Sequence, residues 1–269
     1  MKFNFDHLVH LVKEPERALR ELTQIGLVGS MGGEHSQWGS FNSLCYFGLS
    51  YIEFLGINRP ETALKVDDNE LIKEAVRELP GNEGLSTIAL RTNDIEGAAE
   101  YIRKLGRVVK GPFPGRRTRQ DGSILEWSMF FVERLASDES LPPFFIDWKQ
   151  SDREREQELK QRQLIREHPL GPVRLQEVLF ASQSLDATVA TWSALCNLEP
   201  EQPFDDPEIA ARCIKLRLPG GDLVFCSPTG PGLTRQRLSA KGPGPFLVRF
   251  EGAEAKQTKD LFGSEYQFH

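Results

Sequence analysis

The sequence predicts an α+β fold made of repeated βαβββ units. Two helix-like segments begin at Pro15 and Ile95, 80 residues apart, and apolar runs of strand length flank both in the same order. A third copy of this order begins near residue 173. A repeated supersecondary unit does not close its own core, so we expect the copies to pair with one another.

The first unit, at about residues 1–66, opens on an apolar strand at 5–12. A helix follows at 15–25, because Pro15 suits a first helical turn and Gly26 suits a helix end. Apolar runs separated by glycines then predict three strands, at 27–31, 41–47 and 50–57.

The second unit, at about residues 82–150, repeats this order. A strand at 84–91 leads to a helix at 95–105, which ends at Gly106. The pair Asp121-Gly122 predicts a hairpin between the first two of the remaining strands. These strands are expected at 107–118, 124–133 and 143–149.

The third unit has a strand at 173–182 and a helix at 185–198, followed by strands at 211–218 and 222–227. Residues 246–262 read as a rudimentary fourth unit. An odd number of complete units leaves one pairing surface unused, which leads to the hypothesis of a homodimer.

Two connectors separate the units. Residues 67–79 predict a short helix, and residues 151–168 are so densely charged that they predict a solvated helix or loop, with binding of a charged partner as the alternative. We therefore expect a two-unit domain holding the site at 1–150, a charged linker at 151–172, and the third unit with the rudimentary fourth at 173–269.

The composition of the chain argues against several classes of protein, among them membrane-spanning and nucleic-acid-binding proteins. Hydrophobic residues make up 39% of the chain and charged residues 27%, as in soluble globular proteins. No apolar run of membrane-spanning length and no signal peptide are visible, so we expect a cytoplasmic protein. A net charge of −6 argues against a nucleic-acid partner. The four cysteines form no CxxC pair, which favours reduced core cysteines over a disulfide or a catalytic thiol.

A carboxylate in an apolar strand gives the first candidate site. Glu53 lies in the run Tyr51-Ile52-Glu53-Phe54, and a buried carboxylate needs a partner because its desolvation is costly. The candidate partner is His7, which shares a strand face with Val9 and Leu11. By the same alternation, Asp6 and His10 face the other side, where we expect His10 to pack under a helix.

The glycine-rich stretch between these strands gives further candidates. His35 lies in a turn from which a side chain can reach a cleft, and the alternative is a histidine that caps backbone groups. Trp38 and Asn42 line the pocket in the same interpretation, or fasten the loop. In the second unit, Arg117 and Arg119 flank the hairpin and suit carboxylate or phosphate recognition.

These motifs resemble the vicinal oxygen chelate superfamily, and in particular its uncharacterised glyoxalase-like branch. The first unit carries Asp6-His7-Leu8-Val9, then the stretch from Gly32 to Leu44, then Tyr51-Ile52-Glu53-Phe54. Trp127 in the second unit and His168-Pro169-Leu170-Gly171 before the third also resemble that branch. Ser40 stands where threonine is usual in the branch.

The resemblance implies that paired units form incomplete, cup-shaped barrels, with a divalent metal inside the cup. Carried over by position, the metal ligands are His7, Glu53 and Asp147, and the metal is Zn, Mn, Fe or Mg. Thr87 stands where a second histidine is expected. The third unit offers Glu177 but has Phe225 at the second ligand position, so the resemblance implies no second metal site.

The function implied is a metal-assisted lyase, isomerase or dioxygenase that acts on a small oxygenated substrate. A metal-bound water, Glu53 or His35 would move the proton. The substrate-binding residues would be Trp38, Asn42, Arg117, Arg119 and Trp127. Two alternatives remain open: a metal-free protein that binds a small molecule, as resistance proteins of the superfamily do, and a structural protein whose cup is filled by its own side chains.

Overall fold

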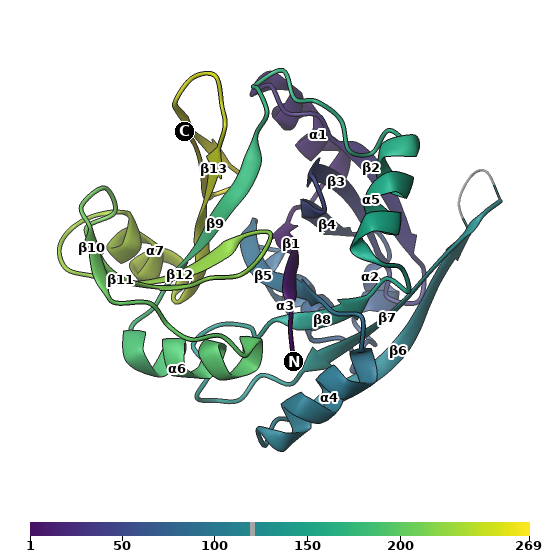
Figure 1. Ribbon diagram of the computed structural model, residues 1–269, viewed down its shortest axis with the longest axis horizontal. Helices are drawn as coiled ribbons and strands as arrows, with labels where there is room; N and C mark the ends of the chain where they lie inside the picture. Colours follow the sequence, from purple (N-terminus) through teal and green to yellow (C-terminus); the bar gives the residue numbers. More distant parts are fainter. Residues whose placement is uncertain (119–121) are drawn as a thin grey trace.

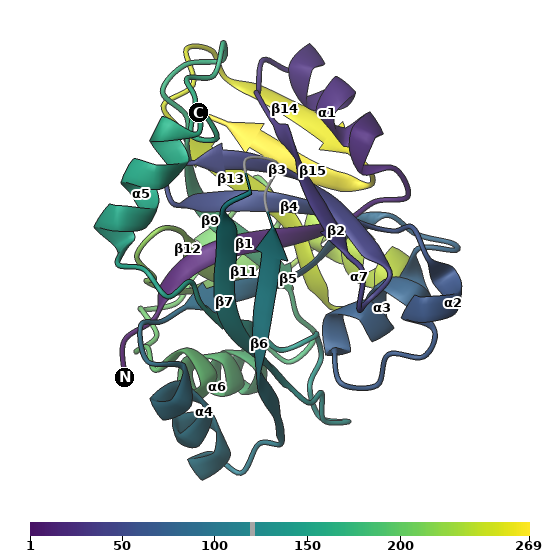
Figure 2. The same cartoon turned by 90° about the vertical axis from the view of Figure 1, so that its right-hand side faces the viewer.

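The computed structural model describes residues 1–118 and 122–269, and the side chains of all these residues except 117 and 118. The chain forms two curled sheets (Figures 1 and 2). The first sheet has eight strands in the order β2-β3-β4-β1-β5-β8-β7-β6. Its strands are β1 (Asn4–Leu11), β2 (Ser30–His35), β3 (Ser40–Phe47), β4 (Ser50–Ile57), β5 (Gly84–Arg91), β6 (Val109–Thr118), β7 (Ile124–Val132) and β8 (Phe144–Asp147).

Two equivalent units build this half-barrel and meet at β1 and β5, which pair antiparallel. In each unit the first strand also pairs parallel with the last, β1 with β4 and β5 with β8. Matching backbone hydrogen bonds close both pairs: Val12 donates to the carbonyl of Leu55, and Thr92 to that of Ile146. The predicted α+β fold of repeated βαβββ units is confirmed, and these bonds fix which positions of the two units are equivalent.

The second sheet has seven strands in the order β10-β11-β12-β9-β13-β15-β14. Its strands are β9 (Arg174–Ala181), β10 (Phe204–Asp206), β11 (Ala211–Leu216), β12 (Asp222–Pro228), β13 (Gly244–Glu251), β14 (Gln257–Leu261) and β15 (Ser264–Phe268). Strand β13 pairs antiparallel with β9, just as β5 pairs with β1. The third unit therefore pairs with strands of the same chain. Its pairing surface is not left unused, which was the reason for expecting a homodimer.

Seven helices accompany the sheets in the part of the chain that the structure describes. They are α1 (Pro15–Gln24), α2 (Pro60–Ala63), α3 (Glu70–Glu78), α4 (Ile95–Lys104), α5 (Asp152–Gln161), α6 (Leu185–Cys196) and α7 (Leu233–Lys241). None of these helices is long and apolar enough to cross a membrane. All four cysteines are buried and free.

The main core lies between the two sheets and joins them. The rings of Phe47 and Phe250 are 4.7 Å apart across this core. His10 is also buried there, with its Nδ1 atom 2.8 Å from the hydroxyl of Tyr266 on β15. The expectation that His10 packs under a helix was wrong, because a second sheet covers this face.

The charged connector is helical, as predicted, but it is not a solvated segment throughout. Ser151 caps α5 through a capping box with Glu154. One face of α5 buries Arg155 and Leu159 against the first sheet. Figure 2 shows α5 to the left and α3 to the right of the strands of this sheet. Residues of both helices line the cavity described next.

Candidate functional site

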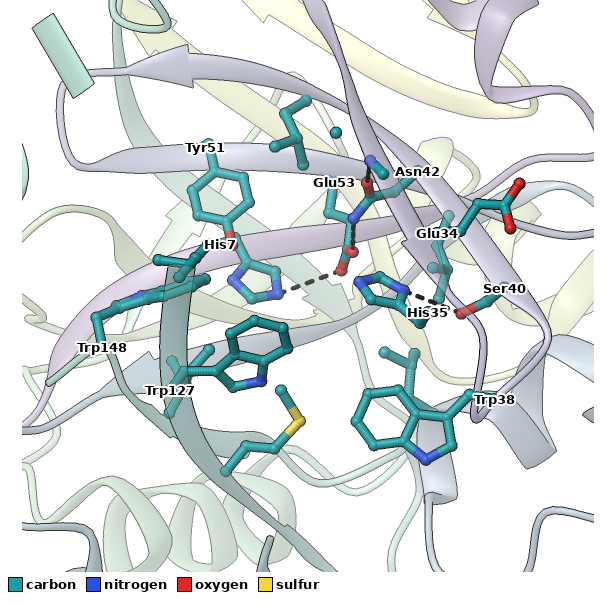
Figure 3. Close-up of a pocket in the computed structure, with 18 of the residues that line it drawn as sticks. His7, Glu34, His35, Trp38, Ser40, Asn42, Tyr51, Glu53, Trp127 and Trp148 are labelled. Carbon is teal, nitrogen blue, oxygen red and sulfur yellow. Dashed lines mark hydrogen bonds and ion pairs between the residues drawn. The ribbon is translucent and has the colours of Figure 1, made fainter. Parts of the chain in front are cut away.

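The inner face of the half-barrel encloses a cavity of about 690 Å³ (Figure 3). Most of its lining is apolar or aromatic, and a few polar side chains converge within it. The aromatic lining residues are Trp38, Tyr46, Tyr51, Trp127, Phe131, Phe144 and Trp148. The combination of an apolar wall and few polar groups is typical of small-molecule sites.

A β-bulge shapes the centre of this site. Phe5 pairs with Leu90 and His7 with Ala89, so Asp6 is an extra residue in β1. The bulge lets two successive side chains meet: Nδ1 of His7 lies 2.7 Å from Oδ1 of Asp6. The second oxygen of Asp6 accepts a hydrogen bond of 2.9 Å from the indole of Trp148. Asp6 therefore orients the His7 ring.

His7 presents its other nitrogen to Glu53. On the paired strands β1 and β4, Val9 lies beside Glu53, so His7 and Glu53 share the inner face. Nε2 of His7 is 3.4 Å from Oε2 of Glu53, and it makes no hydrogen bond with any described residue. The ring of His7 also stacks on Tyr51, with centroids 4.5 Å apart.

The electrostatics of this pair favour charged forms on both sides. Burial by itself lowers the pKa of His7, but the hydrogen bond to Asp6 and the contact with Glu53 raise that pKa to about 9. Burial by itself raises the pKa of Glu53, but the contact with His7, the charge of His35 and the amide of Asn42 together lower it. Near neutral pH, His7 is an imidazolium and Glu53 a carboxylate.

Asn42 holds the carboxylate of Glu53, and Gly32 and Gly33 allow the Asn42 side chain to take this position. The Asn42 amide donates to Oε1 of Glu53 at 2.5 Å, while its oxygen accepts a hydrogen bond of 3.0 Å from the backbone of Gly33. A Cβ atom on Gly32 would lie only 2.0 Å from the Asn42 oxygen. The Gly32-Gly33 motif therefore leaves room for the side chain that holds Glu53.

His35 and Trp38 lie on the other side of the carboxylate. Figure 3 shows the carboxylate of Glu53 between the rings of His7 and His35. Nδ1 of His35 lies 3.1 Å from the hydroxyl of Ser40, its partner across β2 and β3. Trp38 lines the cavity wall next to His35, with ring centroids 6.0 Å apart.

The second unit brings fewer of the expected residues to the cavity. Trp127 lines it, and its indole covers Gly115, where a Cβ atom would lie 2.0 Å from a ring carbon. Asp147 does not line it: both its oxygens bond Lys149, at 2.8 Å each. Arg119 lies outside the described residues, as does the side chain of Arg117.

Of the three expected metal ligands, His7 and Glu53 lie together in the cavity wall, and Asp147 does not join them. The equivalent hydrogen bonds of the two units place Thr87 and Phe144 at the positions of His7 and Glu53. The Thr87 hydroxyl bonds the carbonyls of Leu141 and Pro142, and Phe144 is apolar. Among the described residues, no three His, Cys, Asp or Glu side chains form a group that could hold a metal ion. The matching of Asp147 to Glu53 was wrong by three positions.

Arg155 and Trp148 line the cavity but were not among the predicted site residues. The guanidinium of Arg155, on α5, lies 3.6 Å above the ring of Trp148. The charge of the one and the aromatic ring of the other did not by themselves indicate a place in the site. A signal existed in the spacing of Arg155 and Leu159, which lie one helical turn apart on the same face of α5.

Comparison with known proteins places this site in a family. The profile of the glyoxalase-like domain family matches residues 5–196, which is more than half of the chain. The chain belongs to this glyoxalase-like family. The family is part of the vicinal oxygen chelate superfamily, so the resemblance seen in the sequence is confirmed. No curated protein matches the sequence of this glyoxalase-like chain.

Two solved structures share the fold of this glyoxalase-like protein over most of its length. A hypothetical protein from Staphylococcus aureus is 23% identical, with a TM-score of 0.78 and 99% of both chains covered. A mutant of 4-hydroxymandelate synthase from Streptomyces coelicolor is 14% identical, with a TM-score of 0.60, over 93% of this chain and 71% of that one. A methylmalonyl-CoA epimerase from Streptomyces coelicolor is 17% identical, with a TM-score of 0.40, over 55% of this chain and 98% of that one.

Proposed function

We propose that this protein is an enzyme of proton transfer at carbon, an isomerase or lyase that acts on a small carbonyl compound. One observation carries the proposal: the buried pair of His7 and Glu53, 3.4 Å apart, lies in the wall of a cavity large enough for a small substrate. Buried, strongly perturbed acid and base groups that face a cavity are typical of catalytic sites.

A purely structural role explains the pair poorly. Removing two charges from water costs several kcal/mol per ion, and a well-packed apolar pair is often as stable or more stable. The Asp6–His7–Glu53 group also has supporting contacts from Trp148 and Asn42. Such a second layer of contacts holds reacting groups in position.

The roles follow from the charges. A substrate with its carbonyl oxygen toward Nε2 of His7 would present the neighbouring carbon to Glu53. The Glu53 carboxylate takes a proton from this carbon, and the C–H electron pair moves through the carbonyl group onto oxygen, giving an enolate. The His7 imidazolium donates a hydrogen bond to that oxygen. Protonation of the same carbon by solvent from the opposite face restores the carbonyl and gives the epimer, and Glu53 then releases its proton to solvent. Alternatively, the enolate electrons restore the carbonyl and form a carbon–carbon double bond, while a leaving group departs with its bonding electrons from the next carbon; this is the lyase outcome.

The proposal uses no resident metal. Members of the superfamily commonly use divalent metals. Here His7 and Glu53 supply donors from one unit, whereas Thr87 and Phe144 supply none from the other. A catalytic zinc site takes three protein ligands, and a non-haem iron site takes two histidines and a carboxylate, which is more than this pair provides. The dioxygenase outcome, which in this superfamily needs two histidines and a carboxylate at the metal, therefore has less support than proton transfer.

A metal-free binding protein is the second candidate. The observation that favours it is the aromatic lining, because seven aromatic side chains around a cavity suit the capture of an apolar ligand. This candidate gives Glu53 no chemical task, and that difference separates the two functions.

Deuterium exchange tests the proposal. A panel of small ketones and oxo acids is incubated with the protein in D₂O, and NMR follows the loss of the protons next to the carbonyl. We expect exchange by the wild type, and a rate at least about 100-fold lower for Glu53→Gln. The matched control is Asp147→Asn, which changes a buried carboxylate outside the cavity and leaves exchange intact. Binding without exchange, unaltered by Glu53→Gln, would support the binding protein instead.

Elemental analysis of protein purified without chelator is the second readout. Less than stoichiometric metal together with exchange supports the proposal. A stoichiometric metal lost in His7→Ala would overturn its metal-free form.

A further inference from the structure

Arg155 is a buried cation in the cavity wall. Its exposed fraction is only 3%, and it comes from α5, the helix of the charged connector. Among the residues that the structure describes, no hydrogen bond or ion pair involves its side chain, and its Nε atom is both buried and unbonded. Its close contact is the face of the Trp148 ring, at 3.6 Å.

Neighbouring arginines show what this position lacks. Arg91 pairs with Asp152 at 2.8 Å, and Arg162 pairs with Glu158 at 3.0 Å. Both carboxylates belong to α5. A cation–π contact stabilises a guanidinium by less than its removal from water destabilises it. Arg155 also lowers the pKa of Asp6 from a distance, but both oxygens of Asp6 already bond His7 and Trp148. The donors of Arg155 therefore lack an acceptor.

Resting on the function proposed above, we propose that Arg155 binds a carboxylate group of the substrate. The substrate is then a small carboxylic acid that also carries a carbonyl group and an apolar body. A guanidinium matches a carboxylate with two parallel hydrogen bonds. A phosphate dianion fits less well, because Arg162, the other arginine of the described cavity lining, already pairs with Glu158.

A chain of contacts places the two ends of such a molecule. Arg155 stacks on Trp148, the indole of Trp148 donates to Asp6, and Asp6 holds His7. The side chains of Trp148 and Asp6 therefore link Arg155, which would bind the acid group, to His7, which would polarise the carbonyl. On the opposite side, Leu71 and Ile72 of α3 offer an apolar wall for the rest of the molecule.

Paired probes test this assignment. Oxo acids with aliphatic and aromatic tails, 2-oxooctanoate among them, are each compared with the methyl ester of the same acid. Binding is followed by calorimetry and by tryptophan fluorescence. For at least one acid, we expect the wild type to bind about tenfold more tightly than the ester, since a charge-assisted, two-pronged hydrogen bond is lost in the ester.

Two variants on the same helix make a matched set. Arg155→Met should remove the preference for the acid, whereas Arg153→Met, which removes the same charge from an exposed position of α5, should keep it. Arg155→Lys retains the charge without the fork and should show a reduced preference; it decides the question if Arg155→Met does not fold. The proposal is overturned if no acid binds more tightly than its ester, or if the preference survives in both Arg155 variants.

The same samples in D₂O separate this inference from the proposed function. A preference for acids that depends on Arg155, without any exchange, supports the carboxylate site and contradicts proton transfer. Exchange that is equal for acids and esters and independent of Arg155 supports proton transfer and contradicts the carboxylate site.

Discussion

The Nδ1 atom of His7 lies 2.7 Å from Oδ1 of Asp6, the residue directly before it in β1. Successive residues of a regular strand point to opposite faces. Here a bulge at Asp6 brings the two side chains together. The Asp6 carboxylate orients the imidazole from one side, and the other ring nitrogen faces Glu53 at 3.4 Å.

Asp6→Asn tests this relationship. The amide cannot stabilise an imidazolium as a carboxylate does, so the pKa of His7 should fall clearly below its value of about 9. NMR titration of the imidazole resonances measures the change. The control is Asp147→Asn, because Asp147 bonds Lys149 and not His7. An unchanged His7 pKa in Asp6→Asn would show that Glu53 alone sets the charge.

The pH dependence of stability provides a second test. The pKa of His7 is raised from 6.5 in the unfolded chain to about 9 in the folded protein. Its stabilising contribution is therefore complete below pH 6.5, falls as the pH rises between these values, and is absent above about pH 9. The loss is on the order of 3 kcal/mol.

Urea unfolding of the wild type and His7→Gln, at pH values from 6 to 9.5, measures this loss. The wild type should lose stability across the range, and the variant should lose much less. Parallel curves for the two proteins would contradict the assignment.

The glycine beside Asn42 allows a steric test. In Gly32→Ala the new methyl group would lie 2.0 Å from the Asn42 oxygen, so the side chain that holds Glu53 must move. We expect a loss of about 1–3 kcal/mol of stability, together with a lower rate in the exchange assay. Gly81→Ala is the control, because its added Cβ would meet nothing within 4 Å. Equal effects of both substitutions would mean that the space beside Asn42 is unimportant.

How much the sequence could predict depends on the kind of signal. Strand and helix patterns are local, so most elements of the three units and the pairing of His7 with Glu53 were predictable from composition and spacing. The exceptions are β2, expected at 27–31 but observed at Ser30–His35, and β10 (Phe204–Asp206), which was not predicted. The position of Asp6 was not, because strand alternation assigns it to the wrong face, and a bulge leaves no clear mark in one sequence. Arg155 was missed because a buried arginine within a charged run resembles its exposed neighbours.

Asp147 shows a different failure. Its apolar surroundings, Ile146 and Trp148, imitate those of Glu53, and matching such a triplet ignores how many residues separate it from the start of the strand. The hydrogen bond from Thr92 to Ile146 shows that the true counterpart of Glu53 is Phe144. Register is set by the hydrophobic pattern along the strand and by turn geometry, which a three-residue motif does not contain.

The inter-sheet contact of His10 predicts a large effect far from the cavity. Tyr266→Phe removes the hydroxyl that lies 2.8 Å from Nδ1 of His10, in a fully buried site. An unpaired buried polar group costs about 1–3 kcal/mol, and denaturant unfolding measures this loss. Tyr101→Phe is the control: its hydroxyl bonds the carbonyl of Ala194 at a more exposed position, so water can replace it. A smaller loss for Tyr266→Phe than for Tyr101→Phe would contradict this reasoning.

A substitution at Phe144 tests whether the missing donor of the second unit limits metal binding. Its ring lies 5.3 Å from that of His7, at the position equivalent to Glu53 in the second unit. Phe144→His adds an imidazole there and brings the donors to three, the number that zinc needs in catalytic sites. Calorimetric titration with Zn²⁺ should show binding at least about 100-fold tighter than in the wild type, and His7→Ala in the same background should remove the gain. If the wild type already binds Zn²⁺ as tightly as Phe144→His, donors from the second unit are not what limits metal binding.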